Sequence, residues 1–174
     1  MALLVAYASE HGSTQQIAQR ISQRLSESQI VECRPLDEVS SLSGFRAAII
    51  GSAVHNQKWL PSASAWINLH KAELSTIPIV AFSVGAPHSA PSWVRSSLAE
   101  TEELRLRDYT RQELGAKTHA LFSGAFRKQD TSHILQAVLG CCGWKNNLSI
   151  VDSEWAKVDK WAIDVAPELS ATQP

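Results

Sequence analysis

Six small and polar residues, SEHGST at Ser9–Thr14, could together bind a phosphate group. Three of them carry hydroxyl groups that donate hydrogen bonds, and Gly12 permits a tight turn. In the segment that follows, apolar residues recur at helical spacing. The loop therefore precedes a helix N-terminus, where free N–H groups and positive potential favour anions. An ordinary strand-to-helix turn with a capping serine or threonine is the alternative interpretation.

This loop lacks the features of two common nucleotide sites. It contains no lysine, which excludes the GxxxxGK[ST] loop of nucleotide triphosphatases, and it lacks the GxGxxG pattern of dinucleotide sites. Neutral donors alone suit a phosphate monoester better than a triphosphate bound with magnesium. Three roles are open to His11: an exposed turn residue, a hydrogen-bond donor to the phosphate, or an acid or base toward a substrate.

Strands alternate with helices along the chain. Apolar segments predict five strands, at 2–8, 29–36, 46–54, 78–86 and 118–126. Apolar residues repeat at helical spacing after the first loop, after Pro61 and over 92–116. The last predicted helix begins at Asp152 or Ser153, one of which would cap it. This order predicts parallel βαβ units in a layered α/β fold.

Ligands of open α/β sheets bind beyond the carboxyl ends of the strands. The loops after the third and fourth strands therefore join Ser9–Thr14 in one candidate site. Trp59, which follows the third strand, either stacks on a bound ring or packs against the next helix. His88 and Trp93 lie in a proline-containing segment and are candidates for substrate contact.

The stretch YASEHGSTQQIAQRI resembles the phosphate loop of flavodoxin-like proteins, whose pattern runs roughly T/S-x-T/S-G-x-T after the first strand. Ser9, Gly12 and Thr14 fall on this pattern. His11 stands where a hydroxyl residue is usual, and Ser13 where asparagine is common. IIGSAVHNQKW, AFSVGA and VDSEWAKVDKWAIDVA are similar to the flavodoxin-domain family that includes menaquinone-dependent protoporphyrinogen dehydrogenase. Two segments, 86–114 and 127–144, depart from that family.

The resemblance implies a flavodoxin-like three-layer sandwich with a five-stranded parallel sheet in the order 2-1-3-4-5. It also implies one noncovalently bound FMN, with the phosphate on the first loop and the isoalloxazine ring between the loops after the third and fourth strands. The implied cofactor-binding residues are Ser9, His11, Gly12, Ser13, Thr14, Ser52, Ala53, Val54, His55, Asn56, Ser83, Val84, Gly85 and Ala86. The candidate acids or bases of a reaction there are His11, His55 and His88.

The function favoured by this interpretation is an FMN-dependent oxidoreductase, similar to protoporphyrinogen dehydrogenases or quinone reductases. It would pass electrons between FMN and a small organic substrate or quinone. Two alternatives stay open. One is an electron-transfer flavodoxin that serves a redox partner protein and has no substrate of its own. The other is a flavin-free protein of the same fold whose histidines perform acid–base chemistry on a small molecule.

Composition and charge argue against a nucleic-acid-binding protein and against a membrane-spanning one. A net charge of −1 argues against a generic nucleic-acid-binding surface. No apolar run approaches the roughly 18 residues of a membrane span, and the N-terminus lacks a basic signal region, so a cytoplasmic location is expected.

Composition also sets expectations for domains, metals and oligomers. The 174 residues are expected to form one domain over 1–169, with a flexible tail over 170–174. The cysteines and the remaining histidines lack ligand spacing, so no metal site is predicted. Apolar residues on the tryptophan-bearing helices are compatible with a homodimer.

Overall fold

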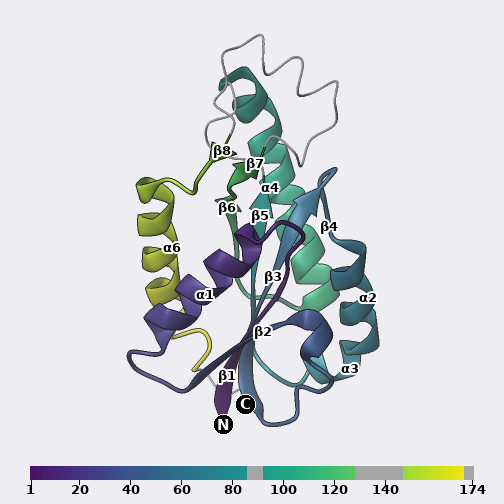
Figure 1. The fold of residues 1–174 in the computed structure, drawn as a ribbon. Coiled ribbons are helices and arrows are strands. Elements are labelled where there is room, and N and C mark those ends of the chain that lie inside the picture. The colour runs from purple at the N-terminus through teal and green to yellow at the C-terminus, as the bar shows by residue number, and fades with distance from the viewer. Residues whose placement is uncertain (86–91, 128–146, 171–174) are drawn as a thin grey trace.

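One mostly parallel sheet forms the centre of the computed structural model, which describes residues 1–85, 92–127 and 147–170 (Figure 1). Its five parallel strands are β1 (Ala2–Ala8), β2 (Val31–Pro35), β3 (Phe45–His55), β5 (Ile79–Gly85) and β6 (His119–Ser123). They lie in the order β2-β1-β3-β5-β6, which confirms the predicted order when the parallel strands alone are numbered. A two-residue strand that was not predicted, β4 (Lys58–Trp59), pairs antiparallel with β3.

Helices cover both faces of this sheet (Figure 1). One face carries α1 (Ser13–Leu25) and α6 (Asp152–Val165). The other carries the 3₁₀ turn η1 (Leu36–Glu38), α2 (Pro61–Leu69), α3 (Lys71–Leu74) and α4 (Ser92–Leu114). A small antiparallel pair, β7 (Phe126–Arg127) and β8 (Asn147–Leu148), lies beyond the end of β6. No helix among the described residues has the length and apolar character needed to cross a membrane.

The cap predicted for the last helix is wrong. The N-cap of α6 is Val151, and no side chain caps this helix. Asp152 instead lies inside the first turn together with Glu154, where negative charge is favoured by the positive end of the helix. Val158, Ala162 and Val165 of α6 are buried in the core on this face of the sheet.

The continuous apolar run of β1 is buried on both faces, as predicted. All residues from Leu3 to Ala8 are less than a tenth exposed, and they alternate between the two core clusters. Gly51 in β3 leaves space for the ring of Phe82 in β5, because a Cβ at position 51 would lie 2.0 Å from Phe82 Cζ. The core is therefore close-packed next to the strand ends that form the candidate site.

The outer strand β6 is covered by two charged side chains of α6. The backbone N–H of Ser123 donates to Glu154 Oε1 at 2.8 Å, and Lys157 Nζ donates to the carbonyl of Leu121 at 2.7 Å. Such partners occupy backbone groups that could otherwise pair with a foreign strand. They also fix the carboxyl end of β6, which borders the candidate site.

Candidate functional site

Three of the predicted loops meet at one edge of the sheet. The strands are parallel and in register, with Ala8 opposite Ser52 and Ser52 opposite Ser83. Their carboxyl ends therefore lie side by side, and Ser9–Thr14 follows directly from β1. Ala86 and His88 lie outside the described residues, so the candidate site is described without them.

Gly12 shapes the first loop. Its φ of +88° lies in the left-handed region that favours glycine, and its N–H donates to Ser9 Oγ at 3.0 Å. Gly12 is also the N-cap of α1, and no side chain caps this helix. The alternative of a capping serine or threonine is therefore wrong. Without such a cap, the first-turn N–H groups of α1 are available to an anion.

Thr14 and Ser13 have different surroundings in the first turn of α1. Thr14 is buried, with 1% of its surface exposed. The Ser13 hydroxyl accepts from the N–H of Ala125 at 3.1 Å and donates to the carbonyl of the same residue at 3.4 Å. Ser13 thus joins the first loop to the segment after β6.

The segment after β6 is a part of the site that the sequence analysis missed. A Cβ on Gly124 would lie 3.0 Å from Val84 Cγ1 and 3.3 Å from Ser13 Cβ. The Gly124 N–H also donates to the carbonyl of Gly85 at 3.2 Å. The rule that ligands bind at the carboxyl edge applies to the fifth parallel strand as well, and it could have identified this segment.

The two serines at the ends of β3 and β5 turn their hydroxyl groups into the protein. Ser52 accepts from the Leu60 N–H at 3.2 Å and donates to the carbonyl of Ala53 at 2.9 Å. Ser83 accepts from Trp59 Nε1 at 2.7 Å. Both serines are fully buried, so their hydroxyl groups hold the loops in place. Ala53, Val54 and Gly85 are partly exposed, whereas Val84 is buried.

Trp59 packs against its neighbours, which confirms the packing interpretation. Its side chain is 4% exposed and lies edge-on to the Tyr109 ring, with 5.8 Å between the ring centroids. Tyr109 in turn exchanges a hydrogen bond with Ser64 of α2, at 3.0 Å. Trp59 therefore anchors β4 between the sheet and the helices of this face.

A two-residue turn places His55 beside the first loop. Asn56 and Gln57 have φ values of +51° and +62°, and His55 pairs with Lys58 across the turn, as in a type I′ hairpin. His55 Nε2 lies 3.2 Å from Glu10 Oε2, and the rings of His55 and His11 are stacked at 6.2 Å. The fold thus brings together two of the three predicted catalytic histidines, both of them exposed.

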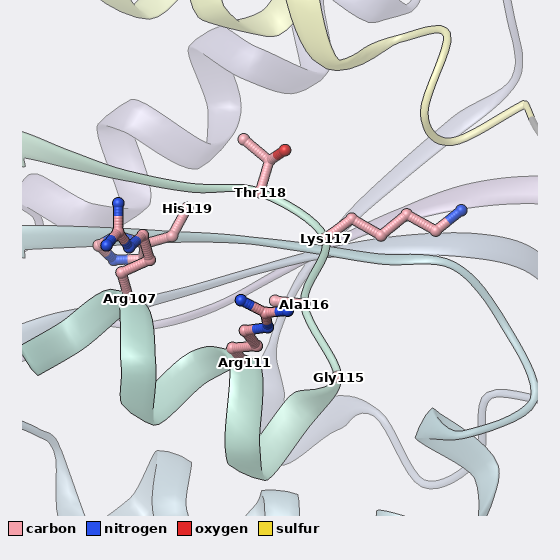
Figure 2. A pocket seen from close by; sticks show the side chains of 7 residues that line it. All are labelled: Arg107, Arg111, Gly115, Ala116, Lys117, Thr118 and His119. Carbon is pink, nitrogen blue, oxygen red and sulfur yellow. The ribbon is translucent and has the colours of Figure 1, made fainter. Parts of the chain in front are cut away.

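A cavity of about 730 Å³ lies at the opposite end of β6 (Figure 2). Arg107 and Arg111 of α4 border it together with Gly115–His119, and Figure 2 shows Arg107 reaching toward the ring of His119. His119 Nε2 lies 2.8 Å from Ser83 Oγ. Burial, aided by the nearby Arg107 guanidinium, lowers the pKa of His119 from 6.5 to about 4. No functional role was predicted for His119, and its neutral ring here supports the buried Ser83.

His119 should make the protein less stable in acid. Its pKa is lower in the folded state than in the unfolded state, so the unfolded chain binds more protons between pH 6.5 and about 4. The stability from neutral His119 is present above pH 6.5 and is lost as the pH falls to about 4, by about 3 kcal/mol. Urea unfolding at a series of pH values measures this loss. His119→Gln, which can still hydrogen-bond Ser83, should reduce the pH dependence, and an unchanged dependence would contradict the assignment.

Comparisons with known proteins agree with this architecture. A family model described as a flavodoxin domain matches residues 4–134. A flavodoxin from the domain Archaea superposes with a TM-score of 0.60 at 15% identity, covering 98% of this chain and 100% of the other. Oxidised flavodoxin 1 from Bacillus cereus gives a TM-score of 0.57, also at 15% identity, with 98% and 100% covered.

A longer protein is similar over part of its length. Rubredoxin oxygen:oxidoreductase from Desulfovibrio gigas superposes with a TM-score of 0.61 at 15% identity, covering 98% of this chain and 37% of the other. A search of curated proteins found no match. At such low identity the structural likenesses show the fold alone.

Proposed function

The chain belongs to the flavodoxin domain family, and from this membership we propose that it is an oxidoreductase that passes electrons between FMN and a small organic substrate or quinone. FMN is the cofactor of the family, and it supplies the redox chemistry when bound. The observation that supports the proposal most directly is the first loop. It ends in a left-handed Gly12 at the start of a helix that no side chain caps.

The residues present fit the phosphate of FMN. The first-turn N–H groups of α1 and the Thr14 hydroxyl are the proposed donors to it, and the helix end adds positive potential. Ser9 and Ser13 act indirectly in this proposal, because their hydroxyl groups already bind Gly12 and Ala125. They would fix the shape of the loop that receives the phosphate.

The proposed ring site lies between the ends of β3 and β5. Because the hydroxyl groups of Ser52 and Ser83 point inward, the backbone of Ser52–Asn56 and Ser83–Gly85 would provide the polar contacts to the ring. Trp59 and its hydrogen bond to Ser83 would keep the two loops at a fixed separation. These residues of the chain would thus orient the ring and shield one side of it from water.

His11 and His55 are the proposed groups that hold or move protons at the mouth of the site. Each side chain is more than a third exposed, so both can exchange protons with solvent or a substrate. Glu10 lies between them, and its carboxylate can orient the imidazole of His55. His88 remains a proposal from the sequence for the same role.

An electron-transfer flavodoxin that serves a redox partner protein is the second candidate. It is favoured by the superposition on flavodoxins over their whole length. The net charge of −1 gives no sign of a strongly acidic docking face, which weakens this alternative. Catalytic turnover separates the two candidates, because only the oxidoreductase reduces or oxidises a small quinone repeatedly without a second protein.

Titration with FMN tests the proposed function directly. We expect one FMN per chain, measured by quenching of flavin fluorescence, and a yellow protein that releases FMN when denatured. We further expect repeated turnover with NAD(P)H as the supplied reductant: NAD(P)H gives two electrons to the flavin, and a small quinone takes them up with two protons to form the quinol. A colourless protein that FMN cannot titrate would overturn both candidates and favour the flavin-free alternative. FMN binding without quinone turnover would favour the electron-transfer protein.

A further inference from the structure

Three side chains with metal-ligating atoms lie together at the mouth of the candidate site. Glu10, His11 and His55 each offer one ligand atom, and these atoms all lie within 4.8 Å of one another. We propose that these three residues bind one divalent transition-metal ion, with Zn²⁺ as the representative. The inference goes beyond the proposed flavin chemistry and does not depend on it, because all the ligands come from the chain itself. A bound ion would take one ring nitrogen of each histidine, so it replaces the proton-transfer role proposed for His11 and His55 whenever the metal is present.

The distances in this cluster are close to those of a metal site. Ligand atoms about 2.1 Å from a zinc ion lie roughly 3–3.5 Å from one another. His55 Nε2 is 3.2 Å from Glu10 Oε2, and His11 Nε2 is 3.9 Å from Oε1, the other oxygen of the same carboxylate. With one ligand atom from each residue, the longest separation is within 4.8 Å. All three side chains are substantially exposed, so small side-chain rotations can close the remaining gap without disturbing the core.

The backbone presents these ligands from two well-defined turns. Glu10 and His11 lie in the loop that Gly12 and Ser9 close by a hydrogen bond. His55 is the last residue of β3, and the two-residue turn at Asn56–Gln57 follows it. A ligand set on fixed turns loses little chain entropy when the metal binds.

The donor set selects the class of metal. Two imidazoles and one carboxylate suit Zn²⁺, Co²⁺ or Fe²⁺, whereas Mg²⁺ and Ca²⁺ prefer a shell of oxygen ligands. Three protein ligands leave at least one coordination position for water or a substrate oxygen. A metal here would lie beside the first loop, where the FMN phosphate is proposed to bind.

The competing interpretation is purely electrostatic. Glu10 could simply pair with the two histidines and tie the first loop to the β3–β4 turn. That arrangement needs a negative charge at Glu10 but no metal affinity. Zinc titration distinguishes the two interpretations.

Calorimetric titration with ZnCl₂ tests the proposal on the purified protein without a histidine tag. The protein is first treated with a chelator, and its thiols are blocked so that cysteines do not bind the ion. We expect one Zn²⁺ per chain, and loss of this binding in Glu10→Gln and in the double variant His11→Ala/His55→Ala. Glu27→Gln, a matched change at an exposed carboxylate paired with Arg24, should leave zinc binding intact.

Paramagnetic Co²⁺ locates the site without any substitution. In ¹H–¹⁵N spectra of the histidine rings, Co²⁺ should broaden His11 and His55 before His70 and His119, which serve as internal controls. No zinc binding, unchanged binding in the double variant, or broadening of the His70 and His119 rings at the same Co²⁺ concentration as His11 and His55 would overturn the proposal. Thr14→Val, which weakens the proposed phosphate contact, should leave zinc binding unchanged, so failure of the flavin proposal is separable from failure of this one.

Discussion

Replacing Thr14 by glutamate should abolish FMN binding. Thr14 lies in the first turn of α1 with 1% of its surface exposed, where we place the FMN phosphate. A carboxylate there would repel the phosphate and occupy part of its space, whereas the wild-type helix end attracts an anion. The expected result is no detectable fluorescence quenching in an FMN titration that saturates the wild-type protein.

Two further variants show whether the loss of FMN binding depends on the position of the charge and on the Thr14 hydroxyl. Gln15→Glu places the same charge on the next residue, which is exposed, and should change FMN affinity by less than about tenfold. Thr14→Val keeps the shape of the side chain and removes only its hydroxyl, and should weaken FMN binding by roughly 10- to 100-fold. Circular dichroism and thermal unfolding show whether each variant is folded. Unchanged affinity in folded Thr14→Val would mean that the phosphate lies elsewhere.

Much of the fold could be predicted because the sequence patterns that indicate its strands and helices each lie within one short segment. The continuous apolar run Ala2–Ala8 is typical of a strand covered on both faces, and the structure buries Leu3–Ala8 in that way. The alternation of strands and helices then leaves few topologies for a parallel sheet. Pro61 at the start of α2 is a further local signal that the structure confirms.

The candidate site was predictable to the level of loops but not of side chains. The sequence places small residues at the ends of β1, β3 and β5, but it does not reveal that the hydroxyl groups of Ser52 and Ser83 turn inward. That orientation depends on partners far along the chain, such as Trp59 and His119 for Ser83. The proximity of His11 and His55 likewise comes from strand pairing, and no spacing rule within one segment could detect it.

The core next to the site should tolerate no side chain at Gly51. A Cβ there would lie 2.0 Å from Phe82 Cζ and 2.3 Å from Phe82 Cε1, and Phe82 itself is fully buried. The ring cannot move aside, since Phe122 and Trp161 pack against it at centroid distances of 6.1 and 6.3 Å. We expect Gly51→Ala to lower the free energy of unfolding by more than about 3 kcal/mol, at the upper end for overpacking of a core.

A double variant separates this steric clash from other effects of the substitution. Phe82→Leu alone should cost about 1–2 kcal/mol, because it leaves a small cavity. Combined with Gly51→Ala it should recover part of the lost stability, because the shorter side chain makes room for the new methyl group. Gly44→Ala is the contrasting control: φ there is +112° and nothing lies within 4 Å, so only backbone strain of roughly 1–2 kcal/mol is expected. Urea unfolding measures the free energy of unfolding of the wild-type protein and of the four variants. If Gly51→Ala alone does not fold, recovery of a folded double variant still supports the clash, whereas strictly additive losses would refute it.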